Sequence, residues 1–388
     1  MTTDSKIRVM QVIAGASFGG AETFFNDLVV ALHGMGLDQV VVTRPNPERI
    51  KLLQAAGITN IETLPFGTPW RDRQTRKKLA KLIQQYKPDI VQSWMTRATI
   101  LCPDSKRAKH DFVHVGWMGG YYNLSYFQKC HHLIGVTFDI ARSLIRQGWP
   151  QNRGHYFRTF AAVQPGKKLN RQDYNTPDDA PLLFALGRMH AKKGFDTLLM
   201  SLRLLPDAYL WLAGDGPLIA NLQKFAHDIG VADRVRFLGW RSDRGDLFAT
   251  ADICVVPSRF EPFGTVVVEA WANRIPLVAT MAAGPSATVR HEVDGMLVPI
   301  DDIDAIAQAV RRLLKDGHLR ERLVANAYVH YLSDFTQSAV ADSYLQFYQD
   351  IIELQPQILQ EMAGAEQQLT RGEKWRKRLN WLLRAGCW

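Results

Sequence analysis

The sequence predicts an α/β protein made of two doubly wound domains, each with a parallel sheet between layers of helices. Short apolar runs alternate with helix-length segments along both halves of the 388-residue chain, as expected where crossover helices join parallel strands. A stretch rich in Lys, Asn, Pro and Asp at 164–181 interrupts this alternation near the middle. A hydrophobic content of 46% is enough for two cores of ordinary domain size.

The first half opens with an apolar strand that leads through a glycine-rich loop into a helix over 21–33. A later helix over 73–86 turns Leu79, Leu82 and Ile83 toward the core and leaves a basic face. The strands expected in this half are 7–13, 39–43, 89–92, 112–115 and 132–136. We therefore expect a first domain over 1–165, followed by a linker over 166–181.

The second half shows six short apolar runs with helical segments mostly between them. The expected strands are 182–186, 209–213, 235–238, 253–256, 277–279 and 296–298, and the expected helices include 265–273, 305–314 and 333–353. We expect a second domain over 182–345, with a crossover helix and tail over 346–388. In such sheets ligands bind at the carboxyl ends of the strands.

Residues 259–271, RFEPFGTVVVEAW, carry the strongest functional signal. Glu261 falls in the loop after the strand 253–256, and Glu269 falls eight positions later, inside the next helix. Either glutamate alone would more often be an ordinary surface charge. Between them lies a helix start, whose unpaired backbone N–H groups favour a phosphate. The candidate donors are those of Phe263, Gly264, Thr265 and Val266.

Three further motifs occur in the same chain. They are Gly19-Gly20-Ala21-Glu22, the segment from Gly187 and Arg188 to Lys193 and Gly194, and Gly214-Asp215-Gly216-Pro217. With the glutamate pair, they resemble the G-G-A-E, G-R-(x)4-K-G, G-x-G-P and E-x7-E motifs of retaining glycosyltransferases of family 4. The resemblance covers the N-terminal loop and nearly all of 182–300, and is weaker over the rest of the first half. It implies the GT-B fold, in which two Rossmann-like domains flank a cleft.

The resemblance also implies roles for individual residues at a donor site for a nucleotide sugar. Arg188 and Lys193 would meet the diphosphate, Glu261 would face the donor sugar, and Glu269 would accept hydrogen bonds from the ribose. Gly19 and Gly20 would line the donor site from the first domain. Preorganised cations at the leaving diphosphate stabilise the transition state more than the ground state. We therefore expect metal-independent catalysis, with no cofactor besides the donor substrate.

The carboxylates of the chain allow two other interpretations. Glu261 and Glu269 could form a glycosidase pair, but Arg188 and Lys193 would then have no task. The Asp-x-Asp at Asp302 opens a helical stretch, where acidic residues ordinarily cap the helix and complement its dipole. The expectation is that Asp302 is a helix cap and that the chain has no metal site.

The acceptor region departs from the family pattern. Where many members have a histidine after the strand 112–115, this chain has Trp117, and His114 is expected to be a core residue. The aromatic rings that follow offer flat faces for sugar stacking, or else fill the core. The candidate acceptor residues are Trp117, Gly119, Gly120, Tyr121 and Tyr122. Glycines and tyrosines here resemble those of bacterial envelope-polysaccharide transferases in the family.

Charge is concentrated in two segments. Residues 71–81 and 371–388 each hold six basic residues and one acidic residue, so together they carry +10 and the rest of the chain carries −1 of the net charge of +9. In the tail, Trp375, Leu379, Leu382 and Leu383 share one helical arc with basic residues opposite. Such a segment lies on anionic membrane surfaces. For 71–81, a solvated face on a packed helix is an equal alternative. No recognition motif accompanies the charge, so nucleic acid is not an expected partner.

Other features place the protein in the cytoplasm. The four cysteines are far apart, which favours neither a disulfide framework nor a zinc site. The N-terminus reads as a strand rather than a signal peptide, and no apolar run is long enough to span a bilayer. We expect a cytoplasmic enzyme, peripheral on the inner face of the cytoplasmic membrane.

The expected function is transfer of a sugar from a nucleotide sugar to a lipid-linked saccharide, in lipopolysaccharide core or envelope polysaccharide synthesis. One alternative is a family 4 transferase that acts on a soluble acceptor. Another is an inactive scaffold that binds nucleotide sugars, since Trp117 replaces a usual active-site residue. Measured turnover would separate the last of these from the first two.

Overall fold

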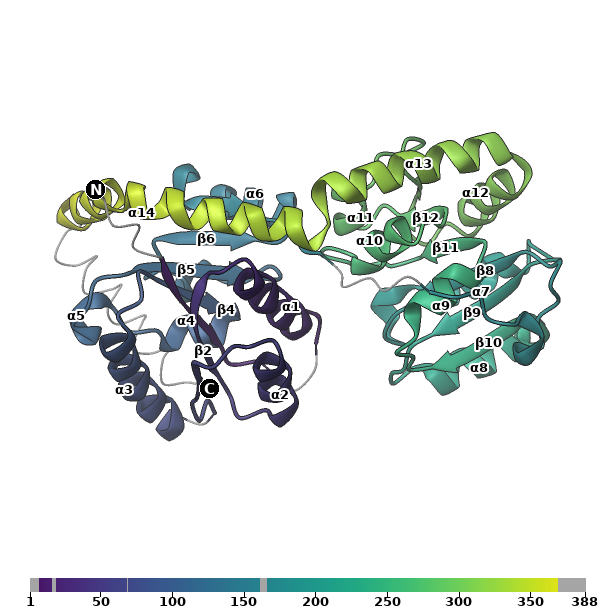
Figure 1. Ribbon diagram of the computed structural model, residues 1–388. Coiled ribbons are helices and arrows are strands. Elements are labelled where there is room, and N and C mark those ends of the chain that lie inside the picture. Colours follow the sequence, from purple (N-terminus) through teal and green to yellow (C-terminus); the bar gives the residue numbers. More distant parts are fainter. Residues whose placement is uncertain (1–6, 16–18, 68, 161–165, 369–388) are drawn as a thin grey trace. The chain divides into compact units, whose positions relative to one another are not determined.

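The computed structural model describes residues 7–15, 19–67, 69–160 and 166–368, apart from the side chains of 69–71 and 363–368. Contacts divide the chain into two units, one formed by residues 1–158 with 340–388 and the other by residues 159–339. We call them unit 1 and unit 2. Each is built around one parallel β-sheet flanked by helices (Figure 1). Among the described residues, no helix is both long and apolar enough to cross a membrane.

Unit 1 contains a seven-stranded sheet in the order β3-β2-β1-β4-β5-β6-β7. The strands are β1 (Arg8–Ile13), β2 (Asp38–Thr43), β3 (Ile61–Thr63), β4 (Ile90–Trp94), β5 (Val113–Met118), β6 (His132–Gly135) and β7 (Gly154–Tyr156). The α-helices are α1 (Gly20–Gly34), α2 (Pro47–Ala55), α3 (Pro69–Tyr86), α4 (Met95–Leu101), α5 (Ser105–Ala108), α6 (Phe138–Arg146) and α14 (Gln337–Gln368). Helices α3, α4 and α5 cover one face, and α1 covers the other (Figure 1).

Helix α14 is part of the core of unit 1, although it comes from the end of the chain. The Tyr348 hydroxyl accepts a hydrogen bond from Gln11 Nε2 (3.2 Å) and donates to Gln92 Oε1 (2.9 Å). Trp94 Nε1 donates to Gln11 Oε1 (2.9 Å), and all four side chains are fully buried. Buried polar groups are stable only when they are paired. The tyrosine therefore supplies partners that the β1 and β4 glutamines need.

Unit 2 contains a six-stranded sheet in the order β10-β9-β8-β11-β12-β13. The strands are β8 (Leu182–Leu186), β9 (Tyr209–Ala213), β10 (Val235–Gly239), β11 (Ile253–Val256), β12 (Leu277–Thr280) and β13 (Met296–Val298). The α-helices are α7 (Phe195–Leu202), α8 (Ile219–Asp228), α9 (Arg244–Thr250), α10 (Thr265–Ala272), α11 (Ala283–Thr288), α12 (Ile303–Lys315) and α13 (Gly317–Asp334). One core packs α7, α8 and α12 on the sheet, and a second core packs α9 and α10.

The structure confirms the predicted doubly wound class and corrects several details. Strands β3 and β7, each of three residues, were missed. The helix expected over 333–353 is interrupted, because α13 ends at Asp334 and α14 begins at Gln337. The expected linker packs within unit 2, where Arg171 pairs with Asp252 (3.0 Å). Unit 1 resumes at Val340, so the boundary expected at 345 lies earlier.

The buried network predicts that Tyr348→Phe lowers the free energy of unfolding by about 1–3 kcal/mol, because two buried glutamines lose a partner. Urea denaturation followed by tryptophan fluorescence measures the change. Tyr121→Phe is the control: that tyrosine is 44% exposed and bonds Asp139, so its loss should cost less than about 0.5 kcal/mol. Equal effects of the two variants would show that the network does not stabilise unit 1.

Candidate functional site

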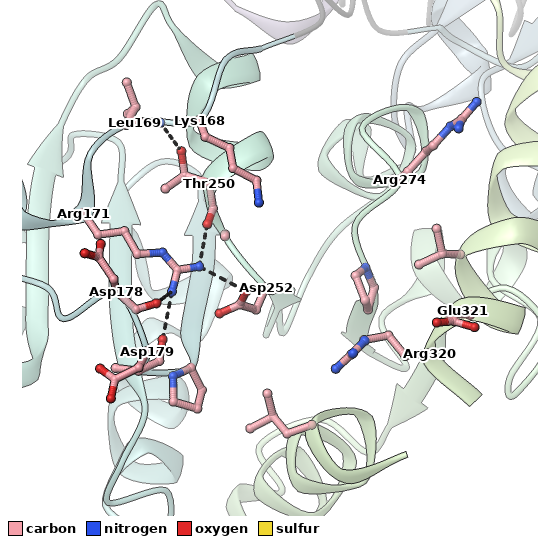
Figure 2. Close-up of a pocket in the computed structure, with 16 residues that line it drawn as sticks. Lys168, Leu169, Arg171, Asp178, Asp179, Thr250, Asp252, Arg274, Arg320 and Glu321 are labelled. Carbon is pink, nitrogen blue, oxygen red and sulfur yellow. Dashed lines mark hydrogen bonds and ion pairs between the residues drawn. The ribbon is translucent and has the colours of Figure 1, made fainter. Parts of the chain in front are cut away.

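Unit 2 has a cavity of about 730 Å³ on the side where its strands begin. Pro181, Asp252 and Pro276, which line it, immediately precede β8, β11 and β12. Figure 2 shows Arg171 bonded to the Asp252 carboxylate and to the Thr250 carbonyl (2.8 Å). This cavity therefore lies at the amino edge of the sheet. None of the motifs found in the sequence contributes to its lining.

Three of the four motifs, all except Gly19-Gly20-Ala21-Glu22 of unit 1, meet at the opposite, carboxyl edge of the same sheet. The loop after β8 bonds the loop after β9, with Gly187 N donating to Ala213 O (3.0 Å) and Met189 N to Asp215 O (2.9 Å). The first turn of α11 bonds the loop after β11, with Gly284 N donating to Glu261 O (2.7 Å). Carboxyl edges of parallel sheets are where such folds bind ligands. We define the donor edge as the loops 187–194, 214–217, 257–264 and 281–284.

An ion pair occupies the centre of the donor edge. Lys193 Nζ pairs with Glu261 Oε2, and the two side chains are 24% and 13% exposed. Arg188 is exposed and makes no hydrogen bond or ion pair with any residue that the structure describes. The edge therefore combines a neutralised pair with a free cation.

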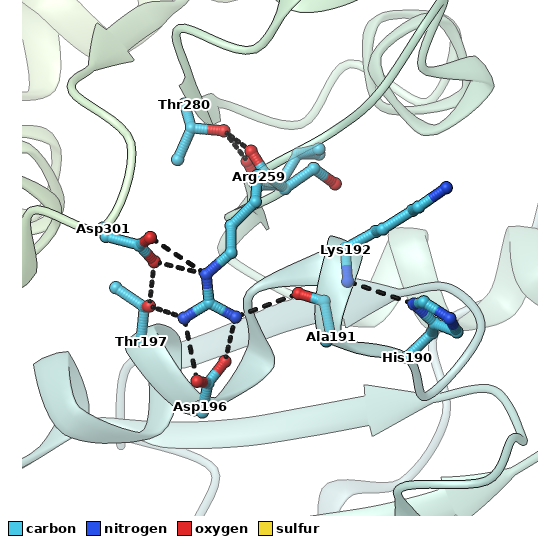
Figure 3. Close-up of polar contacts among 10 residues, drawn as sticks. His190, Ala191, Lys192, Asp196, Thr197, Arg259, Thr280 and Asp301 are labelled. Atoms are coloured by element: carbon cyan, nitrogen blue, oxygen red, sulfur yellow. Dashed lines mark hydrogen bonds and ion pairs between the residues drawn. The ribbon is translucent and has the colours of Figure 1, made fainter.

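Arg259, which the sequence analysis missed, ties the two loops of this ion pair together. Its guanidinium donates to both oxygens of Asp196 (2.8 Å each), to both of Asp301 (2.7 and 2.9 Å) and to Ala191 O (2.9 Å), as Figure 3 shows. Its backbone N–H donates to Lys192 O (2.8 Å). The two carboxylates raise the pKa of Arg259, Asp196 most strongly. The loop that carries Glu261 is thus bound to the loop that carries Lys193.

Two glycines allow these loops to approach each other. Gly194 has a φ of +64°, and a Cβ built on it would lie 2.1 Å from Pro257 O. A Cβ on Gly284 would lie 2.5 Å from Phe263 O. Side chains at either position would push the loops apart. The glycine that closes the G-R-(x)4-K-G segment therefore has a packing role.

Glu269 lies inside α10 with only 4% of its surface exposed. Arg244 Nη1 donates to its Oε1 at 2.9 Å. Burial raises the pKa of Glu269, and the charge of Arg244 opposes that shift. Arg244 is a second residue that the sequence analysis missed, since it precedes its partner by 25 positions.

The first turn of α10 provides the expected phosphate-ready backbone. Gly264 is the N-cap residue, with a φ of +86°, and α10 starts at Thr265. The N–H groups near a helix start have no partner inside the helix. Phe263, Gly264, Thr265 and Val266 therefore span the start of α10, next to the donor edge, and their binding of a phosphate stays a prediction.

The structure contradicts the prediction that Trp117 offers a face for sugar stacking. Its ring is 2% exposed and lies 4.5 Å from the Trp94 ring and 5.9 Å from the Phe24 ring, between centroids. Its Nε1 donates to the Tyr344 hydroxyl of α14 (3.1 Å). Trp117 is a core residue, because a partner distant in the sequence satisfies its only polar group.

The other candidate acceptor residues lie at the carboxyl edge of the unit 1 sheet, after β5. Gly119 and Gly120 are half-buried, and a Cβ on Gly119 would lie 2.8 Å from the Trp117 ring. Tyr121 is 44% exposed and bonds Asp139; burial, then this hydrogen bond, raises its pKa to about 12. Tyr122 stacks on Phe127 at 6.0 Å. Of the candidate rings, that of Tyr121 is the most accessible.

Asp302 and His114 have the structural roles that the sequence predicts. Asp302 is the N-cap of α12, accepting from Ala305 N (2.9 Å), as predicted. His114 is a core residue, as predicted, with Nε2 2.9 Å from Ser93 Oγ and a pKa lowered to about 3 by burial. Gly19 precedes α1 and Gly20 begins it. Within the described residues, no three His, Cys, Asp or Glu side chains form a group that could hold a metal ion.

Comparison with known proteins agrees with these motifs. The family model described as Glycosyl transferases group 1 matches residues 166–330, and Glycosyltransferase Family 4 matches residues 18–160. The lipopolysaccharide core biosynthesis glycosyltransferase LpsE of Rhizobium meliloti (strain 1021) is 34% identical over 330 residues, which cover 84% of this chain and 95% of LpsE. LpsD of the same organism is 31% identical over 349 residues, which cover 88% of this chain and 98% of LpsD.

Solved structures share the fold at lower identity. Anabaena Alr3699/HepE in complex with UDP has a TM-score of 0.77 at 18% identity, covering 89% of this chain and all of that one. The lipopolysaccharide outer core galactosyltransferase WaaB, in its apo form, has a TM-score of 0.71 at 14% identity. The match covers 90% of this chain and 99% of the WaaB chain. At such identities the similarity concerns the fold alone.

The role of Arg259 predicts that Arg259→Gln loosens the donor edge locally. Hydrogen exchange at Phe260 and Gly284 should accelerate about tenfold or more, because Asp196 and Asp301 lose their shared counter-ion and the loops separate. Hydrogen–deuterium exchange with mass spectrometry measures this. Arg312→Gln, which removes an exposed pair with Glu292, is the control and should leave the donor edge unchanged. Unchanged hydrogen exchange in Arg259→Gln would show that Arg259 does not hold the two loops of the donor edge together.

Proposed function

The chain belongs to the family 4 glycosyltransferases and has their GT-B fold, and from that premise we propose that it transfers a sugar, with retention of configuration, from a nucleotide sugar to a lipid-linked saccharide. The acceptor we propose is a growing lipopolysaccharide core. LpsE and LpsD, which align over most of their length, are named for that biosynthesis. Alr3699/HepE, with the same fold, binds UDP.

The observation that carries the proposal is the ion pair of Glu261 with Lys193 on the loop of Arg188, which has no partner among the described residues. When the anomeric carbon leaves the diphosphate, negative charge grows on the phosphate oxygens and positive charge on the sugar. Cations and the N–H groups of a helix start stabilise the negative charge on the phosphate, and a carboxylate stabilises the positive charge on the sugar. The donor edge offers both kinds of group from adjacent loops.

Donor binding then exchanges partners within the donor edge. Arg188 and the α10 N–H groups hold the diphosphate, and Lys193 turns from Glu261 toward it. Glu261 is freed to stabilise the positive anomeric carbon. The acceptor hydroxyl attacks from the face that the diphosphate leaves, and its proton passes to a phosphate oxygen. Since Arg188 and Lys193 supply the positive charge, activity should persist in EDTA.

Glu269 recognises the ribose in this proposal. Its buried carboxylate is bonded to Arg244, whose side chain is 42% exposed. Arg244 can move toward solvent and leave Glu269 to accept from the ribose hydroxyls. Trp240 and Arg241 follow β10, and the Trp240 side chain is 76% exposed. Both are then candidate neighbours of the nucleotide base.

The acceptor is proposed to bind at the carboxyl edge of unit 1, near Gly119, Gly120, Tyr121 and Tyr122. The protein is proposed to act at the inner face of the cytoplasmic membrane. Helix α3 supports this placement, since Arg73, Lys77, Lys78 and Lys81 are all exposed on it. The tail expected to bind membranes, 371–388, lies outside the described residues. A soluble acceptor remains the alternative if no membrane contact is found.

Glu261→Gln tests the catalytic assignment. Turnover should fall by about 10²-fold or more, because a preorganised charge at the anomeric carbon is lost. Nucleotide binding should stay within a few-fold of wild type. Release of nucleoside diphosphate from each of a panel of nucleotide sugars measures turnover, and calorimetry measures nucleotide binding. Near-normal turnover in the folded variant would contradict the role of Glu261, and no transfer by wild type with any donor would favour an inactive scaffold.

A triple variant of α3, in which Lys77, Lys78 and Lys81 are all replaced by Gln, should bind anionic vesicles more weakly than wild type. Each basic side chain near such a surface contributes on the order of 1 kcal/mol, so the loss should be about 10²-fold and should shrink as salt rises. Vesicle sedimentation measures it, with and without residues 371–388. The matched control changes the exposed Lys51, Lys224 and Lys315. Equal weakening by both triple variants would contradict a specific role for α3.

A further inference from the structure

The carboxyl edge of the unit 1 sheet brings two arginines to flank the loop after β1. Thr43 of β2 and Trp94 of β4 both pair with Ile13, so Arg44 and Met95 leave the sheet at the same level. Two strand spacings separate them, about 9–10 Å. Met95 turns sharply, with a φ of +60°, and α4 starts there, which sets Arg97 beside the same edge.

Arg44 is a half-buried cation without an ion-pair partner among the residues that the structure describes. Its Nε is buried and has no hydrogen-bond partner, and its guanidinium forms no ion pair with the described residues. The neighbouring Arg49 is bonded to Thr43 Oγ1 (2.8 Å) and Asn26 Oδ1 (3.1 Å). Burial lowers the pKa of Arg49, the charge of Glu22 raises it and the charge of Arg44 lowers it, so Arg49 lies near both charged groups. A buried donor that lacks a partner is costly. An anion bound at this edge would remove that cost.

Arg97 and Thr75 leave further donors unused at the same edge. Arg97 Nη2 pairs with Asp72 (2.7 Å), but its buried Nε has no partner within the described chain. Thr75 is fully buried, and its Oγ1 has no partner there either. It lies one turn before Leu79 on the buried stripe of α3, toward the end where that helix starts. Leu64 N bonds Thr43 O (2.9 Å), which joins the segment before α3 to Arg44.

We propose that Arg44, Arg97 and Thr75 form a subsite for an anionic substituent, a phosphate or a carboxylate, on the saccharide acceptor. The inference rests on the proposed function, because it takes the acceptor to bind at unit 1. The donor diphosphate does not need these groups, since Arg188, Lys193 and α10 serve it in unit 2. A guanidinium matches the planar oxygens of phosphate and carboxylate, and a neutral sugar would leave Arg44 unpaired.

Direct binding tests the subsite without requiring turnover. The probes are glucose 6-phosphate, glucuronate and glucose, and saturation-transfer NMR at low salt measures their binding. All measurements use the Arg188→Gln variant as the background, because this substitution removes the phosphate contact at the donor edge. At least one anionic probe should bind about tenfold or more tightly than glucose, and Arg44→Gln should abolish that advantage. Arg44→Lys should restore part of it. The control, Lys51→Gln, removes an exposed charge on α2 and should change nothing.

The outcomes separate the alternatives. A preference for glucose 6-phosphate assigns the substituent as phosphate, and one for glucuronate assigns it as carboxylate. Equal binding with and without Arg44, or equal losses in Arg44→Gln and Lys51→Gln, would overturn the subsite. Transfer to a lipopolysaccharide core fragment, before and after phosphatase treatment, tests the proposed function separately. No transfer to either fragment would count against that function, while the probe binding still decides the subsite.

Discussion

The donor edge depends on one guanidinium, that of Arg259. Three segments far apart in the sequence converge on it: Ala191 and Asp196 after β8, Arg259 itself after β11, and Asp301 after β13. A planar fork of five donors can serve two carboxylates and a carbonyl together, which a lysine cannot. Asp301 has a φ of +60°, a backbone conformation that costs energy in a residue with a side chain. The contacts with Arg259 and Thr197 Oγ1 (2.7 Å) compensate for that cost.

Both motif glutamates are paired with a cation, and this has a consequence for how the site works. An isolated carboxylate at 13% or 6% side-chain exposure would be strongly disfavoured without a counter-ion. Lys193 and Arg244 provide those counter-ions, and both are more exposed than the glutamates they serve. The cations are therefore the members of each pair that can move when a substrate brings its own charges. Each basic side chain balances the charge of the glutamate that it contacts, and Arg244 opposes the rise in the pKa of Glu269 that burial causes.

Features that depend on residues close together in the chain could be predicted from the sequence. Features that depend on residues far apart in the chain could not. The turn between Glu261 and Glu269, the Asp302 cap and five of the strand positions in the first half follow from local patterns. Arg259 could not be recognised, because its carboxylate partners lie 63 and 42 positions away. Trp117 was misjudged because Tyr344, which satisfies its Nε1, lies 227 positions away. Strands β3 (IET) and β7 (GHY) were missed because neither is an apolar run, whereas β13 (MLV), which is equally short, is apolar and was predicted.

The two units use buried polarity differently, and this bears on where substrate specificity is determined. In unit 1 the polar network of Gln11, Gln92 and Tyr348 lies inside the fold and attaches α14, so it serves stability. In unit 2 the polar network around Arg259 lies at the carboxyl edge and shapes the loops that carry the motifs. Each carboxyl edge nevertheless presents an arginine without a partner among the described residues, Arg44 in unit 1 and Arg188 in unit 2. An anion that reaches such an arginine stabilises it, whether the side chain is half-buried like that of Arg44 or exposed like that of Arg188, and the proposals for the two substrates rest on these two side chains.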